Sequence, residues 1–142
     1  MDYVILTGKD REKQKEVIEK YKPIVMVIDQ GPKVSPYGAK QHSTVENKQR
    51  IFQAYRELAT KHKCSILSLG QGDQSTQGKR WLYLDQMDGS KVGIPGELDV
   101  CIGIGKQEVE NRRYINIIAN KLTGKHSKFV CGFDYEESRY MD

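Results

Sequence analysis

The chain has 142 residues, of which 37% are hydrophobic and 30% charged, and its net charge at pH 7 is +4. This length predicts one domain over residues 1–142, and this composition excludes a chain that is disordered throughout. No apolar run approaches the ~20 residues of a membrane helix, and the N-terminus lacks the pattern of a secretory signal, so we expect a cytoplasmic protein with no membrane partner. The positive charge permits a nucleic-acid partner without requiring one.

The first part of the chain alternates between short apolar runs and helical patterns. Residues 3–6 are an apolar run, and Thr7 then offers an N-cap to a helix that extends to Tyr21. Pro23 prevents that helix from continuing. Residues 24–28, with the sequence IVMVI, are apolar without alternation, which is typical of a parallel strand covered by helices on both faces.

A loop, a second helix and another strand are predicted next. Residues 30–42 hold two prolines and two glycines, which is the composition of a loop. Ser43 and Glu46 then form a capping box, and apolar residues at helical spacing continue the helix as far as about Lys63. Residues 65–69, with the sequence SILSL, predict the strand that follows.

The second half is predicted to be mostly β-structure. Residues 70–97 are polar and contain six glycines, and a loop of this length is uncommon unless it is functional. Residues 98–105 predict a strand, and residues 114–120 and 128–133 predict two strands joined as a hairpin. The order of elements indicates an α/β fold with a mainly parallel sheet and an antiparallel edge. Ligands of such sheets meet the carboxyl ends of the strands.

The three cysteines are predicted to have a structural role. Cys64, Cys101 and Cys131 are odd in number, widely spaced and set in apolar runs. We therefore expect small buried side chains in a reducing compartment rather than disulfides or metal ligands.

Two polar residues fall where predicted strands end. Asp29 follows residues 24–28, and a carboxylate in that position can hold magnesium through the waters that this ion retains. The alternative is an aspartate that caps a turn or a helix. Gln71 follows residues 65–69, where an amide can contact a γ-phosphate and move when the phosphate leaves. The alternative is a solvated loop glutamine.

Basic and aromatic residues in the long polar segment are candidates for nucleic-acid contacts. Lys79 and Arg80 precede Trp81, and this trio could contact a phosphate and stack on a base. The alternative for Trp81 is a side chain that packs into the core, and we favour it.

Two tight turns offer further candidates. The sequence DGSK contains Gly89, Ser90 and Lys91, whose backbone and hydroxyl suit a phosphate oxygen, unless this is only a surface loop. Lys121 begins the connection KLTGKHS between the two strands of the predicted hairpin. From that position a cation could reach a neighbouring subunit's phosphates, and the alternative is a solvated charge.

A phosphate-binding loop is missing from the sequence. Such a loop needs G-x-x-x-x-G-K-[ST], in which glycines expose backbone N–H groups and the lysine reaches the phosphates. Gly-Lys pairs occur, but none has a glycine five positions earlier and none is followed by Ser or Thr. No catalytic Ser/His/Asp or Cys/His signature is present either.

The order and spacing of these segments resemble the RecA-like ATPase domain of DnaB-type hexameric replicative helicases, especially those of bacteriophages. The family's helix and Walker B strand are similar to VIEKYKPIVMVIDQ, and its next strand, which ends in a glutamine, resembles CSILSLGQ. The family's DNA-binding loop and following strand resemble LDQMDGSKVGIPGELDVCIGIG, and its closing hairpin and final strand resemble IIANKLTGKHSKFVCGFDYEESRYMD. The resemblance covers nearly the whole chain, although no single motif is specific.

The resemblance implies a RecA-like three-layer fold and roles in an ATPase that uses ATP and Mg²⁺. Asp29 would be the Walker B acid, and Gln71 would sense the γ-phosphate. Gly89, Ser90 and Lys91 would lie in the loop that faces single-stranded DNA.

A basic finger that acts across the subunit interface would match Lys121. The family often has an arginine two residues beyond this lysine, where the present chain has Thr123. The finger would then be Lys121 alone, or Lys125.

The family's phosphate loop and catalytic glutamate lie upstream of the segments that this chain resembles. We therefore expect the C-terminal part of a motor domain: an expressed piece, a split gene or a remnant. Alone it would be inactive and bind ATP weakly. Its sheet would lack strands, including a neighbour of the Asp29 strand, and the exposed edge would favour dimerisation. The intact protein would be a homo-hexamer that moves along single-stranded DNA.

Two functions of other classes stay open. The chain could be a non-enzymatic α/β module that binds nucleic acid or protein. It could also be a different small enzyme that uses Asp29 and residues 70–97 for metal-dependent chemistry.

Overall fold

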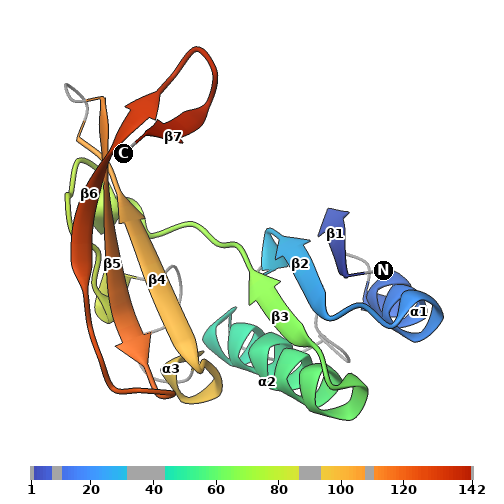
Figure 1. Ribbon diagram of the computed structural model, residues 1–142. Helices are drawn as coiled ribbons and strands as arrows, with labels where there is room; N and C mark the ends of the chain where they lie inside the picture. The colour runs from blue at the N-terminus through green and yellow to red at the C-terminus, as the bar shows by residue number, and fades with distance from the viewer. Residues whose placement is uncertain (1, 8–10, 32–43, 87–93, 108–110, 142) are drawn as a thin grey trace. The chain divides into compact units, whose positions relative to one another are not determined.

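A computed structural model describes residues 2–7, 11–31, 44–86, 94–107 and 111–141 of the chain. The contacts divide the chain into two compact units, Met1–Gln71 with Val92–Glu97 and Gly72–Lys91 with Leu98–Asp142. The first unit holds a parallel three-stranded sheet and the second an antiparallel four-stranded sheet (Figure 1). The predicted α/β class is confirmed. The antiparallel part is larger than the hairpin expected from the sequence.

The first unit is built from β1 (Tyr3–Thr7), β2 (Val25–Asp29) and β3 (Ser65–Ser68), in that order across the sheet. The β2 strand lies between the other two and pairs with both in parallel register. The expectation that the Asp29 strand lacks a neighbour is therefore wrong. Thr7, the predicted helix cap, ends β1 opposite Asp29, and residues 8–10 between it and α1 lie outside the described residues.

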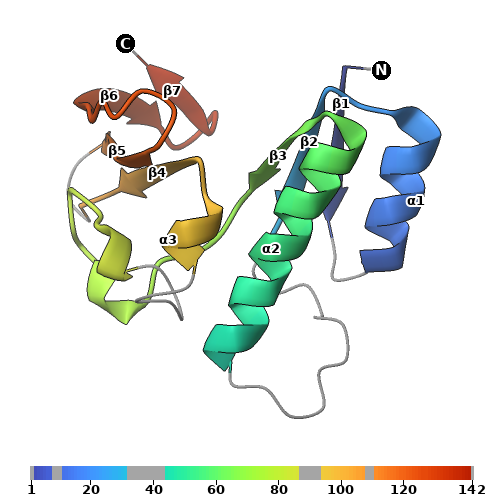
Figure 2. The ribbon, with the colours of Figure 1, turned by 90° about the horizontal axis from the view of Figure 1, so that it is seen from below.

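Two helices cover one face of this sheet. The helices are α1 (Arg11–Tyr21) and α2 (Thr44–His62), close to the predicted bounds, and Figure 2 shows both on the same side of the strands. Their apolar faces meet the alternate residues Met26 and Ile28 of β2, which are fully buried. The core of the unit comprises Ile18, Met26, Ile28, Ile51, Phe52, Ala54, Tyr55 and Leu58.

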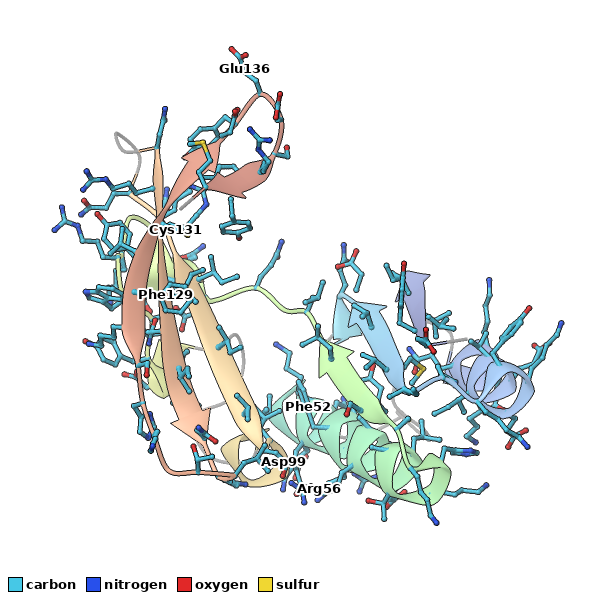
Figure 3. All side chains as sticks on the ribbon, viewed as in Figure 1. Phe52, Arg56, Asp99, Phe129, Cys131 and Glu136 are labelled. Atoms are coloured by element: carbon cyan, nitrogen blue, oxygen red, sulfur yellow. The ribbon has the colours of Figure 1, made fainter. Side chains whose placement is uncertain are left out.

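The other face of β2 is only partly covered among the described residues. Val25 and Val27 are half-buried, so burial alternates along the strand instead of being continuous as the sequence predicted. The short helix α3 (Ile94–Glu97) also belongs to this unit and lies against α2. There the guanidinium of Arg56, which Figure 3 labels, lies 3.7 Å from the Glu97 carboxylate.

The second unit is an antiparallel sheet with the strand order β4-β5-β6-β7. Its strands are β4 (Val100–Gly105), β5 (Arg112–Asn120), β6 (Lys128–Asp134) and β7 (Arg139–Met141). The predicted hairpin is confirmed as the antiparallel pair β5–β6. The sequence did not predict β7, which pairs with the end of β6 after a turn in which Asp134 accepts hydrogen bonds from two backbone N–H groups.

Two short 3₁₀ helices, η2 (Gln74–Thr76) and η3 (Leu84–Gln86), interrupt the segment that precedes the sheet of the second unit. The Asp73 side chain caps η2 by accepting a hydrogen bond of 2.7 Å from the Ser75 amide. Among the described residues, no helix is long and apolar enough to cross a membrane.

Candidate functional site

The carboxyl edge of the parallel sheet carries the first two candidate residues. Asp29 is the last residue of β2, and Gln71 follows the neighbouring strand β3 in the same unit. The segments leaving the two strands remain hydrogen-bonded, since the Leu69 amide donates to the Ile28 carbonyl at 2.9 Å and the Gly31 amide donates to the Leu69 carbonyl at 3.1 Å. Asp29 and the segment leading to Gln71 therefore leave the sheet side by side.

The turn after Asp29 is fixed by close contacts. Gln30 has a φ of +54°, in the left-handed region, and Gly31 is buried against β3 and α2. A Cβ atom at Gly31 would collide with the Ser68 hydroxyl, so a larger residue would require the Ser68 side chain to move. The Tyr55 hydroxyl of α2 donates a buried hydrogen bond of 3.1 Å to the Gly31 carbonyl.

Gly31 and Tyr55 were not identified as site residues from the sequence. The glycine two positions after a strand-ending acid is a signal that could have indicated a tight turn. The hydroxyl of Tyr55 gave no such signal, because its position at helical spacing predicts only a core side chain.

The Asp29 carboxylate is suited to a hydrated cation. It is half-buried at a strand end, so that water can reach it, and one carboxylate is enough to hold magnesium through its waters. No group of three or more His, Cys, Asp or Glu side chains that could hold a metal ion is found among the described residues. Asp29 is therefore a candidate for magnesium contact through bound water, and it has no cluster of further ligands among the described residues.

Lys121 lies in a turn that Asn120 organises. The Asn120 side chain accepts hydrogen bonds from the Leu122 and Thr123 amides, at 3.1 and 3.2 Å, and donates to the Thr123 hydroxyl at 2.7 Å. Gly124 takes a φ of +69° in the same turn. The Lys121 side chain is exposed, and its backbone amide donates to the Asp99 carbonyl at 2.8 Å. This side-chain network, which the sequence did not reveal, holds the connection between β5 and β6.

The candidate trio at 79–81 lies on the antiparallel sheet. A Cβ atom at Gly105 would collide with the Arg80 carbonyl oxygen, so this glycine of β4 makes room for the segment. The buried Asn116 side chain of β5 donates to the Leu82 carbonyl at 2.8 Å and accepts from the Leu82 amide at 3.3 Å. The backbone of the segment is therefore anchored to β4 and β5, and the Arg80 side chain adds a hydrogen bond of 2.8 Å to the Gln107 side chain. Lys79 and Arg80 themselves are exposed.

Trp81 packs against the antiparallel sheet but does not belong to the buried core that we favoured for it. Its ring meets the Tyr114 ring edge to face at a centroid distance of 5.3 Å, and it is only partly exposed. The Lys128 amino group lies 5.3 Å from the Trp81 centroid and 5.6 Å from the Tyr83 centroid, and the Arg80 guanidinium lies 5.3 Å from the Tyr114 centroid. Cations and aromatic rings thus alternate over this part of the second unit.

The structure brings together only some of the candidates. Asp29 and Gln71 share the carboxyl edge of one sheet, whereas Lys79, Arg80 and Lys121 belong to the other unit. The predicted DNA-binding turn, with Gly89, Ser90 and Lys91, lies outside the described residues.

The cysteines are less buried than the sequence predicted. All three are free thiols of intermediate exposure, and Figure 3 shows Cys131 on β6. Burial raises the pKa of the Cys101 thiol, and burial also raises the pKa of the Cys64 thiol, with a smaller opposing effect from a backbone hydrogen bond. Both thiols are therefore protonated at neutral pH and poorly nucleophilic.

The fold defined by these elements is that of the ATPase domains of DnaB-like replicative helicases, as the sequence resemblance implied. The chain superposes on one solved ATPase domain with a TM-score of 0.76 and 14% identity, over 92% of this chain and 49% of that one. It superposes equally on a DnaB-like replicative helicase studied for its interactions with primase, with a TM-score of 0.75 and 14% identity, over 92% of this chain and 34% of that one.

These likenesses concern the fold. The chain spans about half the length of the first structure and about a third of the second. No protein-family model matches the chain, and no curated protein matches its sequence.

Proposed function

We propose that the chain is the C-terminal part of the motor domain of a DnaB-type, phage-like replicative DNA helicase. The observation that carries this proposal is the superposition of 92% of the chain on two such ATPase domains, with Asp29 and Gln71 at the carboxyl edge of the parallel sheet. The intact protein would be a cytoplasmic homo-hexamer that hydrolyses ATP and moves along single-stranded DNA.

The two strand ends have complementary tasks in this proposal. Asp29 would orient the waters of a magnesium ion, which supplies positive charge to the phosphates of ATP. Gln71 would donate a hydrogen bond to the γ-phosphate and lose it when the phosphate leaves. The hydrogen bonds from Leu69 to Ile28 and from Gly31 to Leu69 hold these strand ends beside each other, which supports their joint response to the nucleotide.

The basic residues of the second unit would serve the other partners. Lys121, or Lys125 in the same turn, would reach the phosphates of ATP bound by a neighbouring subunit. Ser90 and Lys91 would contact the backbone of single-stranded DNA, with Lys79 and Arg80 as further phosphate contacts.

The first test is a titration of the chain with magnesium and ATP, followed by the fluorescence of Trp81, the only tryptophan. Because the sequence has no phosphate-binding loop, we expect no saturable change at millimolar ATP. Tight binding of ATP by this chain alone would contradict the proposal that it is one part of a nucleotide site.

The second test concerns DNA. Lys91→Ala should weaken binding to a single-stranded oligonucleotide and reduce the slope of log K against log[salt] by about 0.7, the value for one lost phosphate contact. Lys61→Ala, which removes the same charge from the exposed end of α2, is the matched control and should leave the slope unchanged. Equal slopes for the two variants would remove Lys91 from the DNA contact.

A second candidate function is a nucleic-acid binding module without enzymatic activity. The alternation of Arg80, Trp81, Tyr83 and Lys128 favours it, since exposed cations and aromatic rings can contact phosphates and stack on bases. The two functions differ in what the intact assembly does. If the DNA affinity of the intact assembly is the same with and without ATP and magnesium, the result would favour the binding module.

A further inference from the structure

Tyr83 carries an exposed aromatic ring on a backbone that is firmly held. The residue is 52% exposed. Its amide donates a hydrogen bond of 2.9 Å to the Gln86 side chain, and its carbonyl accepts one of 3.0 Å from the Gln86 amide. Gln86 is only 7% exposed, so a buried amide group holds a residue that itself lies at the surface. A ring fixed in this way is suited to contact a ligand, because little freedom is lost when the ligand binds.

The preceding residue, Leu82, is held in a similar way by β5. The buried Asn116 side chain donates to the Leu82 carbonyl and accepts from the Leu82 amide. In the sheet register, Asn116 lies opposite Lys128, the first residue of β6. The strand residue that anchors the segment therefore lies beside the lysine that approaches its aromatic rings.

Lys128 contacts two rings at once. Its amino group lies 5.3 Å from the Trp81 centroid and 5.6 Å from the Tyr83 centroid. Val130 is two residues further along β6, on the same face of the strand, and is about half exposed. We refer to the side chains of Trp81, Tyr83, Lys128 and Val130 as the Tyr83 surface. It combines exposed aromatic and apolar groups with a cation.

The charges around the Tyr83 surface favour an anionic ligand. Residues 79–86 hold the cations Lys79 and Arg80 and one acidic residue, Asp85, and all three are exposed. Lys128 adds a further cation. A single-stranded nucleic acid matches both features, because an unpaired base can stack on an aromatic ring while its phosphate meets a lysine. Bases inside a duplex are already stacked on one another and have no free face to offer.

We propose that the Tyr83 surface is a base-stacking site for single-stranded DNA, in which one unpaired base lies on the Tyr83 ring and its phosphate contacts Lys128. The choice of DNA rests on the proposed function. The inference deepens that function, since it assigns a contact with a base where Lys79 and Arg80 supply contacts with phosphates. Gln86 and Asn116 are positioning residues, because they hold the backbone and not the ligand.

The first measurement compares two probes, with the complete chain and without ATP. One probe is a single-stranded oligonucleotide of about twelve thymidines, a length that such sites can accommodate. The other has the same length and the same phosphates but no bases. We expect the thymidine oligonucleotide to bind more tightly in fluorescence anisotropy. It should also quench Trp81, the only tryptophan, because the stacked base lies beside the ring that Lys128 contacts.

Tyr83→Ala should weaken binding of the thymidine oligonucleotide by about 5- to 100-fold, the loss expected for one stacked base. Its affinity for the probe without bases should stay the same. Tyr83→Phe keeps the ring and should bind as the unchanged chain does. Tyr21→Ala is the matched control and should change neither affinity. Tyr21 is 42% exposed and has the Lys20 amino group 5.2 Å from its ring centroid, but it belongs to the first unit.

Lys128→Ala removes a phosphate contact and keeps the stacking ring. It should reduce the slope of log K against log[salt] by about 0.7 for both probes. Tyr83→Ala should leave both slopes unchanged, because its ring carries no charge. Lys20→Ala, which removes the cation beside Tyr21, is the matched control and should also leave the slopes unchanged.

Equal affinities of the unchanged chain for the two probes would overturn the stacking site. The same conclusion would follow if Tyr83→Ala bound the thymidine oligonucleotide as tightly as Tyr21→Ala does. Tighter binding of the corresponding RNA would overturn the choice of DNA.

The stacking site and the helicase function can fail separately. If Lys91→Ala reduces the salt slope but Tyr83→Ala does not weaken binding, the stacking site is wrong and the DNA contact of the proposed helicase stays. If Tyr83→Ala weakens binding but ATP and magnesium leave the DNA affinity of the intact assembly unchanged, the stacking site stays and the helicase function is wrong.

Discussion

At the scale of single residues, the position of Asp29 depends on contacts made by the residues that follow it. Gly31 packs closely against the Ser68 side chain, and its carbonyl accepts the hydrogen bond from Tyr55. Helix α2 thus fixes the turn that orients the end of β2. Catalytic and binding groups need such support, because their geometry is lost when the surrounding residues are free to move.

Tyr55→Phe removes one hydroxyl from this arrangement and leaves the buried Gly31 carbonyl without that donor. We expect a loss of about 1 kcal/mol in the free energy of unfolding, measured by urea denaturation. Tyr3→Phe is the control, because the Tyr3 side chain is mostly exposed, and it should change stability by less than about 0.5 kcal/mol. Equal stabilities of the two variants would show that the hydrogen bond does not hold the turn.

At the scale of elements, the antiparallel sheet depends on its fit to the segment that carries Lys79 and Arg80. The strand β4 has glycine at two alternate positions, Gly103 and Gly105, on the face that this segment covers. A Cβ atom at Gly103 would lie 2.9 Å from the Leu82 Cβ atom, and one at Gly105 would lie 2.6 Å from the Lys79 carbonyl oxygen. The repeat CIGIG is therefore the sequence signal of a close backbone approach.

Gly105→Ala should displace the segment that includes Arg80 and Trp81. Overpacking of this kind destabilises a domain by about 1–3 kcal/mol, and we expect a shift of that size in urea denaturation together with a changed emission maximum of Trp81. Gly96→Ala in α3 is the control, since a Cβ atom there meets nothing within 4 Å, and it should not destabilise. An emission maximum that Gly105→Ala leaves unchanged would count against the contact.

The elements that the sequence predicted well are those that a local pattern specifies. The helix α2 follows from its capping residues and apolar spacing, and the β5–β6 hairpin follows from two apolar runs around a glycine-containing turn. The strand β7 has no such pattern, because its three exposed residues are selected by pairing with β6. The partial exposure of one face of β2 was also not predicted. Five consecutive apolar residues do not indicate which face of a strand the helices will cover.

The candidate site was predictable to a similar degree. Asp29 and Gln71 could be found because a polar residue after an apolar run marks a strand end, and parallel strands end at one edge. The contacts of Gly31, Tyr55, Asn116 and Asn120 could not be found, because each depends on a partner that only the fold brings near. The roles of Asp29, Gln71 and Lys121 remain predictions.

At the scale of the whole molecule, the chain links its two compact units more than once. The helix α3 belongs to the first unit, whereas the described residues before it, Gly72–Gln86, and those from Leu98 onward belong to the second. Glu97 of α3 accepts hydrogen bonds from Gln53 and Arg56 of α2. The residues on both sides of α3 belong to the second unit. If the first unit unfolded separately, α3 would therefore be released while the chain before and after it stayed folded.

This connectivity favours the single domain that the sequence predicted, and two optical signals can test it. Circular dichroism in the far ultraviolet is dominated by α1 and α2 of the first unit, and the fluorescence of Trp81 reports on the second. If residues 1–142 unfold as one domain, the two urea denaturation curves should coincide. Gly105→Ala, which acts only in the second unit, should then shift both curves equally, because cooperative units share one free energy of unfolding. A shift confined to the fluorescence curve would show instead that the chain contains two independently stable domains.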